Sequence, residues 1–181
     1  QDPDIILVGE IRDITTGGIA VKAAQTGHMV MSTLHTNDGP QTLTRLQDMG
    51  VQSFAVATSI NLITAQRLLR RLNPDNRVEI EMPDDALRKE DFPEEMIKAG
   101  MQLYGPGEET EENPGYKGRA GIYQVMPISE DLKRLIIEEA NAVQLADQAA
   151  KEGVWDIRRS GLQKVADGIT SLAEVNRVTV E

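Results

Sequence analysis

The 181-residue chain contains no cysteine, few aromatic residues and no long hydrophobic run. Without cysteine it can form neither a disulfide scaffold nor a metal site with thiolate ligands. Aromatic residues make up 3% of the chain and hydrophobic residues 40%, so we expect a core of aliphatic side chains. No apolar run approaches the roughly 20 residues that a membrane-spanning helix needs. The sequence predicts one domain, or a domain with a small appendage, and no direct membrane insertion.

Negative charge is concentrated in one part of the chain. The formal net charge is −10, which argues against nucleic acid as the main partner. Twelve acidic and three basic residues lie between positions 79 and 112, a net charge of −9 in this stretch, called the acidic segment below. Its prolines and its Gly-Pro-Gly turn mark an inserted module. Two interpretations remain open: a solvated surface loop with one short helix, or a docking surface for a basic partner.

The pattern before the acidic segment alternates between strands and helices. No initiator methionine or signal peptide precedes the first apolar run, so we expect a piece of a longer protein. The strand–helix–strand–helix order predicts an α/β fold with a mostly parallel sheet. The expected elements are strands over 5–8 and 29–34 and helices over 15–26, 38–49 and 53–72, followed after the acidic segment by a strand over 119–126 and helices over 130–140, 142–151, 156–167 and from 171.

A carboxylate follows the first predicted strand. In Asp2-Pro3-Asp4-Ile5-Ile6-Leu7-Val8-Gly9-Glu10-Ile11-Arg12-Asp13, Glu10 comes one small residue after the apolar run. The carboxyl ends of parallel strands form the crevice in which α/β sheets bind ligands. A carboxylate at this place can polarise an attacking water or help to hold Mg²⁺ beside a nucleotide γ-phosphate. The alternative is a solvated strand end or an ion pair.

Both histidines of the chain flank the second predicted strand. His28 and His35 are seven residues apart, and an odd offset sends them to opposite faces of a straight strand, so they are not two ligands of one metal. His35 is expected at the same sheet edge as Glu10. With Thr33 and Thr36 beside it, His35 could hydrogen-bond a phosphate or an attacking water. The alternative is a histidine that is satisfied at a strand end, and for His28 a structural capping role is favoured.

These two segments together carry a family resemblance. DPDIILVGEIRD followed by TGHMVMSTLHTN resembles the secretion ATPase superfamily, which comprises type II secretion and type IV pilus motors. The first segment is similar to the family's Walker B region and the second to its histidine box. The resemblance covers the chain apart from roughly residues 78 to 113, and it favours a pilus-assembly or secretion motor over a retraction motor. Further similar segments are QTLTRLQDMGV, AQRLLRRL, GYKGRAGIYQVMPI and SLAEVNRVT.

The resemblance implies a fold and a mechanism. It implies the C-terminal part of a RecA-like P-loop NTPase domain with an appended, mainly helical C-terminal module. It implies ATP and Mg²⁺ as cofactors of the full-length protein, with Glu10 activating the attacking water and His35 near the γ-phosphate. Arg12, Thr33 and Thr36 are the candidate nucleotide-binding residues, although Arg12 fits a structural or intersubunit ion pair better than a phosphate contact.

The resemblance also implies partners and a location. Such motors are cytoplasmic homo-hexamers that dock on the inner-membrane platform protein of a pilus or secretion machine, so we expect peripheral association with that membrane and a possible regulatory protein. The implied segments are a partial ATPase core (1–72), an acidic inserted module in place of the family's zinc-binding subdomain (73–118), and a C-terminal strand and helices (119–181). The alternatives are a type II secretion ATPase, or a docking module without catalysis in this part.

The sequence departs from the family at two places. The family's two zinc-binding CxxC pairs are replaced by Asn73-Pro74-Asp75-Asn76 and Glu111-Glu112-Asn113-Pro114, so we predict no zinc and a module held by packing. No GxxxxGK[ST] phosphate loop occurs in the chain. Without that loop nothing holds the β- and γ-phosphates, and we expect this chain alone to hydrolyse ATP negligibly.

Overall fold

The computed structural model describes residues 3–180, so that Gln1, Asp2 and Glu181 lie outside the description, including the aspartate that opens the DPDIILVGEIRD motif. The chain divides into two compact units, one of residues 1–65 and 124–154, the other of residues 66–123 and 155–181. These two units are defined by how compactly the residues pack. They do not test the three segments expected from the sequence (1–72, 73–118 and 119–181), which stay a prediction. Within residues 3–180 no helix is both long and apolar enough to cross a membrane.

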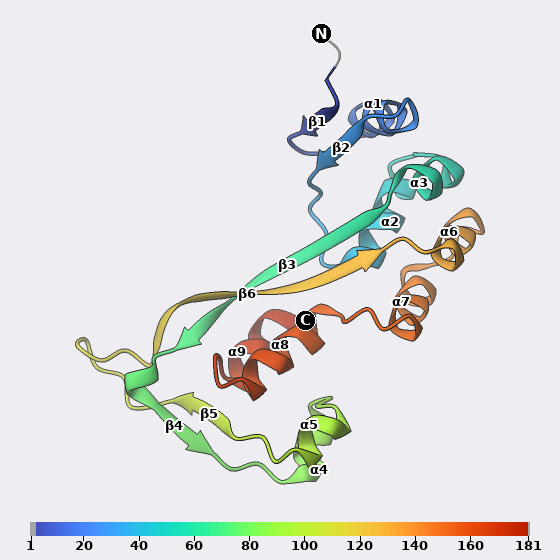
Figure 1. Ribbon diagram of the computed structural model, residues 1–181. Helices are drawn as coiled ribbons and strands as arrows, with labels where there is room; N and C mark the ends of the chain where they lie inside the picture. Colours follow the sequence, from blue (N-terminus) through green and yellow to red (C-terminus); the bar gives the residue numbers. More distant parts are fainter. Residues whose placement is uncertain (1–2, 181) are drawn as a thin grey trace. The chain divides into compact units, whose positions relative to one another are not determined.

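The first unit is built around a parallel strand pair. Strand β1 (Ile5–Val8) and strand β2 (Met29–Ser32) pair in parallel, and helix α1 (Ile14–Gln25) connects them (Figure 1). The α/β class and the parallel pairing of these strands are therefore as predicted. The remaining helices of this unit are α2 (Gly39–Asp48), α3 (Ser53–Ser59), α6 (Glu130–Ile137) and α7 (Ala142–Lys151).

Aspartate caps begin the first two helices. The Asp13 carboxylate accepts the Thr16 N–H at 2.8 Å and starts α1, although two glycines lie in its first turn. Asp38 starts α2, within the helix expected over 38–49, by accepting the Gln41 N–H at 2.8 Å. These short-range bonds satisfy helix N–H groups that have no partner within the helix. The caps place the loops that follow β1 and β2.

The predicted long helix over 53–72 is wrong. Helix α3 ends at Ser59, and strand β3 (Leu62–Leu72) follows, paired with strand β6 (Tyr116–Pro127). Leucine, arginine and glutamine favour helix, and this propensity produced the error. From Leu62 onward, however, alternate side chains such as Ile63 and Ala65 are buried, which is the period of a strand. The conformation of β3 is decided by its pairing with β6, which lies more than 40 residues later in the chain. Local residue propensity carries no information about such a pairing.

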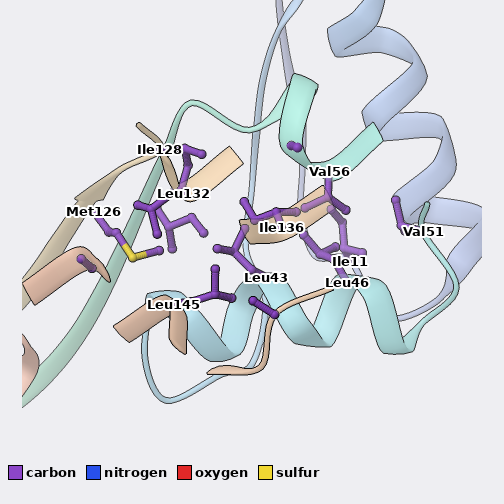
Figure 2. Packing of buried hydrophobic residues seen from close by; sticks show 14 of the residues in the cluster. Ile11, Leu43, Leu46, Val51, Val56, Met126, Ile128, Leu132, Ile136 and Leu145 are labelled. Atoms are coloured by element: carbon purple, nitrogen blue, oxygen red, sulfur yellow. The ribbon is translucent and has the colours of Figure 1, made fainter. Parts of the chain in front are cut away.

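Aliphatic side chains form the core of the first unit. Leu43 and Leu46 on α2 meet Leu132 and Ile136 on α6, and Leu145 joins them from α7 (Figure 2). All five are at most 3% exposed. No aromatic side chain belongs to this cluster, as the composition predicts. Helix α2 and the helices after β6, which are distant in sequence, thus pack into one core.

The second unit contains the acidic segment and the last two helices. Strand β4 (Arg77–Ile80) pairs antiparallel with strand β5 (Leu103–Pro106), and the two helices between them are short. The predicted cap Ser171 accepts the Glu174 N–H at 3.2 Å, but the Glu174 carboxylate accepts hydrogen bonds from arginines instead of closing a capping box. The helices of this unit are η1 (Pro74–Asn76), α4 (Asp84–Lys89), α5 (Glu94–Lys98), α8 (Ile157–Ala166) and α9 (Leu172–Thr179).

Asparagine side chains connect the two segments that stand in place of the family's CxxC pairs. Asn73, which is 4% exposed, donates through Nδ2 to Asn113 Oδ1 at 3.0 Å and to the Pro114 carbonyl at 2.9 Å. Asn76 donates to the Asn113 carbonyl at 2.7 Å and to the Glu108 carbonyl at 2.8 Å. Amide hydrogen bonds therefore join the same two segments that a shared zinc ion would join, in addition to the packing that the sequence predicts.

This asparagine network gives a first prediction. Replacing buried Asn73 with alanine removes two part-buried hydrogen bonds to the facing loop, which at about 0.5–1.5 kcal/mol each should lower the free energy of unfolding by about 1–3 kcal/mol. Because the network contains no thiolate, a chelator such as EDTA should leave the thermal midpoint unchanged. Denaturant and thermal unfolding measure both effects, with the exposed Asn61→Ala as the matched control. A midpoint that falls on chelation would contradict the prediction that this protein needs no zinc.

Candidate functional site

The loops that follow β1 and β2 are fixed to each other. The Ile11 N–H donates to the Thr33 carbonyl at 3.0 Å, and the Thr33 hydroxyl donates to the Gly9 carbonyl at 2.7 Å. The Ile11 side chain is 8% exposed and belongs to the aliphatic core of its unit. A side chain added at Gly9 would meet nothing within 4 Å, so the space beside this loop is open. Core packing and two hydrogen bonds thus set the position of Glu10.

Glu10 lies between a histidine and an arginine. Its Oε1 is 3.0 Å from His35 Nε2, and its Oε2 accepts a hydrogen bond from Arg12 Nε at 2.6 Å. The Glu10 side chain is 20% exposed, whereas His35 and Arg12 are 88% and 75% exposed. The hydrogen bond from Arg12 lowers the pKa of Glu10, with burial opposing it and the charges of Arg12 and His35 adding to it. The carboxylate is therefore ionised at neutral pH.

These three side chains line a cavity of about 320 Å³ together with residues of α2. Arg45 comes from the last turn of α2, and Met49 follows at its end. Two arginines and an imidazole against one carboxylate make the lining suited to an anion such as a phosphate. Sequence reasoning missed Arg45 and Met49. Their i, i+4 spacing places both on one face of α2, and that was the available signal.

The two threonines make internal hydrogen bonds. Thr33 holds the loop of Glu10, as described above. The Thr36 hydroxyl lies 2.7 Å from the hydroxyl of Thr42, which itself donates to the Asp38 carbonyl at 2.8 Å. Neither threonine lines the cavity. The structure therefore gives both hydroxyls a partner within the protein, and their role toward a nucleotide stays a prediction.

The other histidine occupies the opposite end of β2. His28 Nδ1 lies 3.1 Å from the Ala23 carbonyl and 3.1 Å from the Thr26 hydroxyl, both at the end of α1. This contact agrees with a structural role. His28 is thus placed apart from His35 along the strand, and the two form no common cluster. Among residues 3–180 no group of three or more His, Cys, Asp or Glu side chains could hold a metal ion.

Comparison with known proteins shows the family to which this chain belongs. The model of the family "Type II/IV secretion system protein" matches residues 1–177, and the chain belongs to this family. It is 56% identical over 179 residues to the type IV pilus assembly ATPase PilB of Pseudomonas aeruginosa, covering 99% of this chain and 31% of that protein. It is 42% identical over 182 residues to the type II secretion system ATPase E of Vibrio cholerae, covering 100% and 35%.

A solved structure supports the same fold. The pilus retraction motor PilT with bound ADP aligns with a TM-score of 0.68 at 21% sequence identity, covering 100% of this chain and 41% of that one. At this identity the likeness concerns the fold alone, and it confirms the predicted RecA-like class. The chain spans about a third of the length of the pilus-assembly and secretion relatives. Recognition of the superfamily from its two motifs is therefore confirmed.

Proposed function

We propose that this chain is the part of a type IV pilus assembly motor that carries the water-activating carboxylate of its ATPase site. The observation that carries the proposal is the position of Glu10, with one oxygen 3.0 Å from His35 Nε2 and the other hydrogen-bonded to Arg12. Both side chains come from the loops that follow a parallel strand pair, where α/β proteins bind ligands. The 52–56% identity to PilB proteins supports pilus assembly over type II secretion, which remains the alternative.

Phosphoryl transfer requires positioning and charge stabilisation more than covalent chemistry. Glu10 is ionised and held from both sides, so it can accept a hydrogen bond from a water and orient that water toward a γ-phosphate. His35 and Arg45 supply positive charge or donors to the same cavity. Mg²⁺ in proteins is usually bound by one or two carboxylates plus substrate phosphates, and Glu10 provides one carboxylate. When bound, the ion would neutralise phosphate charge.

Other parts of the motor lie outside these residues in our proposal. A glycine-rich phosphate loop would come from sequence beyond this chain, and the chain alone would hydrolyse ATP negligibly. The proposed assembly is a cytoplasmic homo-hexamer that associates with the inner membrane through a platform protein. The likeness to pilus and secretion ATPases supports these expectations, and a regulatory protein is a further candidate partner.

The test of this proposal uses the two histidines as a matched pair. In the protein with its phosphate loop present, His35→Gln should lower kcat about tenfold to a hundredfold, less than the roughly 10²–10⁴ of a general base. His28→Gln removes the histidine at the other end of the same strand and should leave kcat unchanged. Steady-state phosphate release measures both variants. Equal rates for wild type and His35→Gln would remove His35 from the mechanism.

A further inference from the structure

An apolar groove lies within the acidic segment of the second unit. It has a volume of about 590 Å³ and runs between the β4–β5 pair and the start of α4. Figure 1 shows α4 directly after the end of β4, with β5 beside that strand. The groove is lined by Ile80, Glu81, Met82, Pro83, Leu87, Met101, Gln102 and Leu103.

One face of the strand pair supplies the floor of this groove. Ile80 pairs with Leu103 across the strands, so their side chains point to the same face, and Val78 lies two residues before Ile80 on that face. Ile80 is 41% exposed and Val78 is 50% exposed, although both are large apolar residues in a strand. Exposed neighbouring apolar side chains of this kind mark interaction sites. Met82 and Met101 add flexible thioethers, which adapt to partners of varied shape.

Carboxylates lie at the border of the apolar floor. Glu81 lines the groove and Asp84 follows its lining residue Pro83, and both are exposed, whereas Glu79 lies between Val78 and Ile80 and therefore points to the other face of the strand. The nearest arginine, Arg88, is engaged by Asp85 at 2.9 Å and by Glu94 at 2.6 Å, so its charge is already neutralised. An acidic rim repels nucleotides, nucleic acid and acidic peptides, and it attracts cations. A matching ligand therefore needs apolar side chains on one side and positive charge at its borders.

We propose that this groove binds a basic amphipathic helix of a partner protein. Apolar side chains of such a helix at i, i+3 and i+4 would enter the groove between Ile80 and Met101, and its lysines or arginines would face the carboxylates of Glu81 and Asp84. The proposal does not depend on nucleotide hydrolysis, because every residue it uses lies in the unit without Glu10 and His35. The proposal extends the interpretation of the acidic segment as a docking surface for a basic partner. It adds an apolar contact, which would make the binding specific.

A labelled model peptide tests the proposal with the chain as it is. The probe is a fluorescein-labelled leucine–lysine peptide of about four helical turns, or about 14 residues, with its leucines on one face. The control peptide has the same composition in an order that spreads the leucines around the helix. Fluorescence anisotropy should show binding of the first peptide that is at least about tenfold tighter than binding of the second, a difference of about 1.4 kcal/mol.

Charge variants of the protein locate the binding. Gln102→Lys and Met101→Lys place a cation in the groove and should weaken binding about tenfold, whereas Val143→Lys, an exposed site in the other unit, should change it less than twofold. Because Gln102 is exposed, its variant decides the outcome if Met101→Lys does not fold. The rim variant Glu81→Gln/Asp84→Asn should weaken binding more than the equally charged Glu111→Gln/Glu112→Gln.

Five results would overturn the proposal. Equal binding of the two peptides, or equal effects of the rim variant and its control, would show that only bulk charge attracts the peptide. If the groove variants bind the peptide as wild type does, the peptide binds at another place on the protein. If no binding is seen at millimolar peptide, the groove does not bind a basic amphipathic helix. Dimerisation of the peptide-free chain that Gln102→Lys abolishes, seen by sedimentation, would assign the groove to a second copy.

Discussion

Replacing Glu10 with glutamine should lower the rate of ATP hydrolysis about 10³-fold in the protein that carries its phosphate loop, within the range of general-base catalysis. Glutamine keeps the size of the side chain and can still contact His35 and Arg12, but it carries no charge and cannot accept the proton or align the water in the same way. The fold should be intact, since Glu10 is held by surface contacts and the Ile11 side chain anchors the loop. The expected defect is therefore in kcat, with nucleotide binding largely retained.

Glu138→Gln is the control for this experiment. Glu138 is an exposed glutamate at the end of α6, and it has no place in the cavity of Glu10. Its replacement removes the same charge and should leave the rate unchanged. Phosphate-release kinetics and nucleotide-binding measurements on both variants separate a loss of catalysis from a loss of affinity. A Glu10→Gln protein that hydrolyses ATP at the rate of the control would contradict the role assigned to this carboxylate.

The second large effect concerns a carboxylate that is fully buried. The Glu174 side chain is 0% exposed, and its two oxygens receive hydrogen bonds from Arg70 at 2.9 Å and from Arg177 at 2.7 Å. Burial raises the pKa of Glu174, but the hydrogen bonds from Arg177 and Arg70 outweigh it and lower the pKa from 4.5 to about 2. Arg70 also stacks on the ring of Tyr116, 4.2 Å from its centroid. These contacts join the end of β3 to helix α9.

Because its pKa is lowered in the folded state, Glu174 stabilises the fold above its unfolded pKa and loses this contribution as pH falls through the folded value. A shift from 4.5 to about 2 corresponds to about 3 kcal/mol in the free energy of unfolding. Glu174→Gln should therefore unfold about 3 kcal/mol more easily at pH 7. The difference from wild type should shrink between about pH 4.5 and pH 2.

Urea unfolding at a series of pH values measures this difference directly. Glu138→Gln again serves as the control, and its difference from wild type should stay within about 0.5 kcal/mol at every pH, as for surface substitutions in general. A Glu174→Gln difference that is the same at pH 7 and pH 2 would show that the loss is steric and not electrostatic. The spacing of Ser171 and Glu174 is typical of a capping box, and nothing local in the sequence indicates the arginine partners that Glu174 has in the structure.

The contrast between confirmed and missed features follows from the range of the interactions involved. Short-range signals worked: Asp38 and Ser129 begin helices in the segments where helices were expected, because each cap depends on residues within one turn. The long helix over 53–72 failed because β3 depends on pairing with β6, a partner distant in sequence. Local propensity cannot report such a partner.

The candidate site followed the same rule. The meeting of Glu10 and His35 could be expected because both follow strands of a parallel pair, whose ends share one edge of a sheet. The i, i+4 spacing of Arg45 and Met49 puts them on one face of α2, but the approach of that face to Glu10 depends on how α2 packs on the core, which the spacing does not indicate. The hydrogen bond between Asn73 and Asn113 was not predicted either. The two residues are 40 positions apart, and local sequence patterns do not report contacts at that separation.

The central claim is that Glu10 and His35 act together on one bound nucleotide, and a double-mutant cycle tests it most directly. The rates of ATP hydrolysis of Glu10→Gln, His35→Gln and the double variant are compared with wild type in the protein with its phosphate loop. The account predicts that the double variant is no slower than Glu10→Gln alone, because His35 contributes through the water that Glu10 orients. Effects that multiply as for independent sites would contradict it.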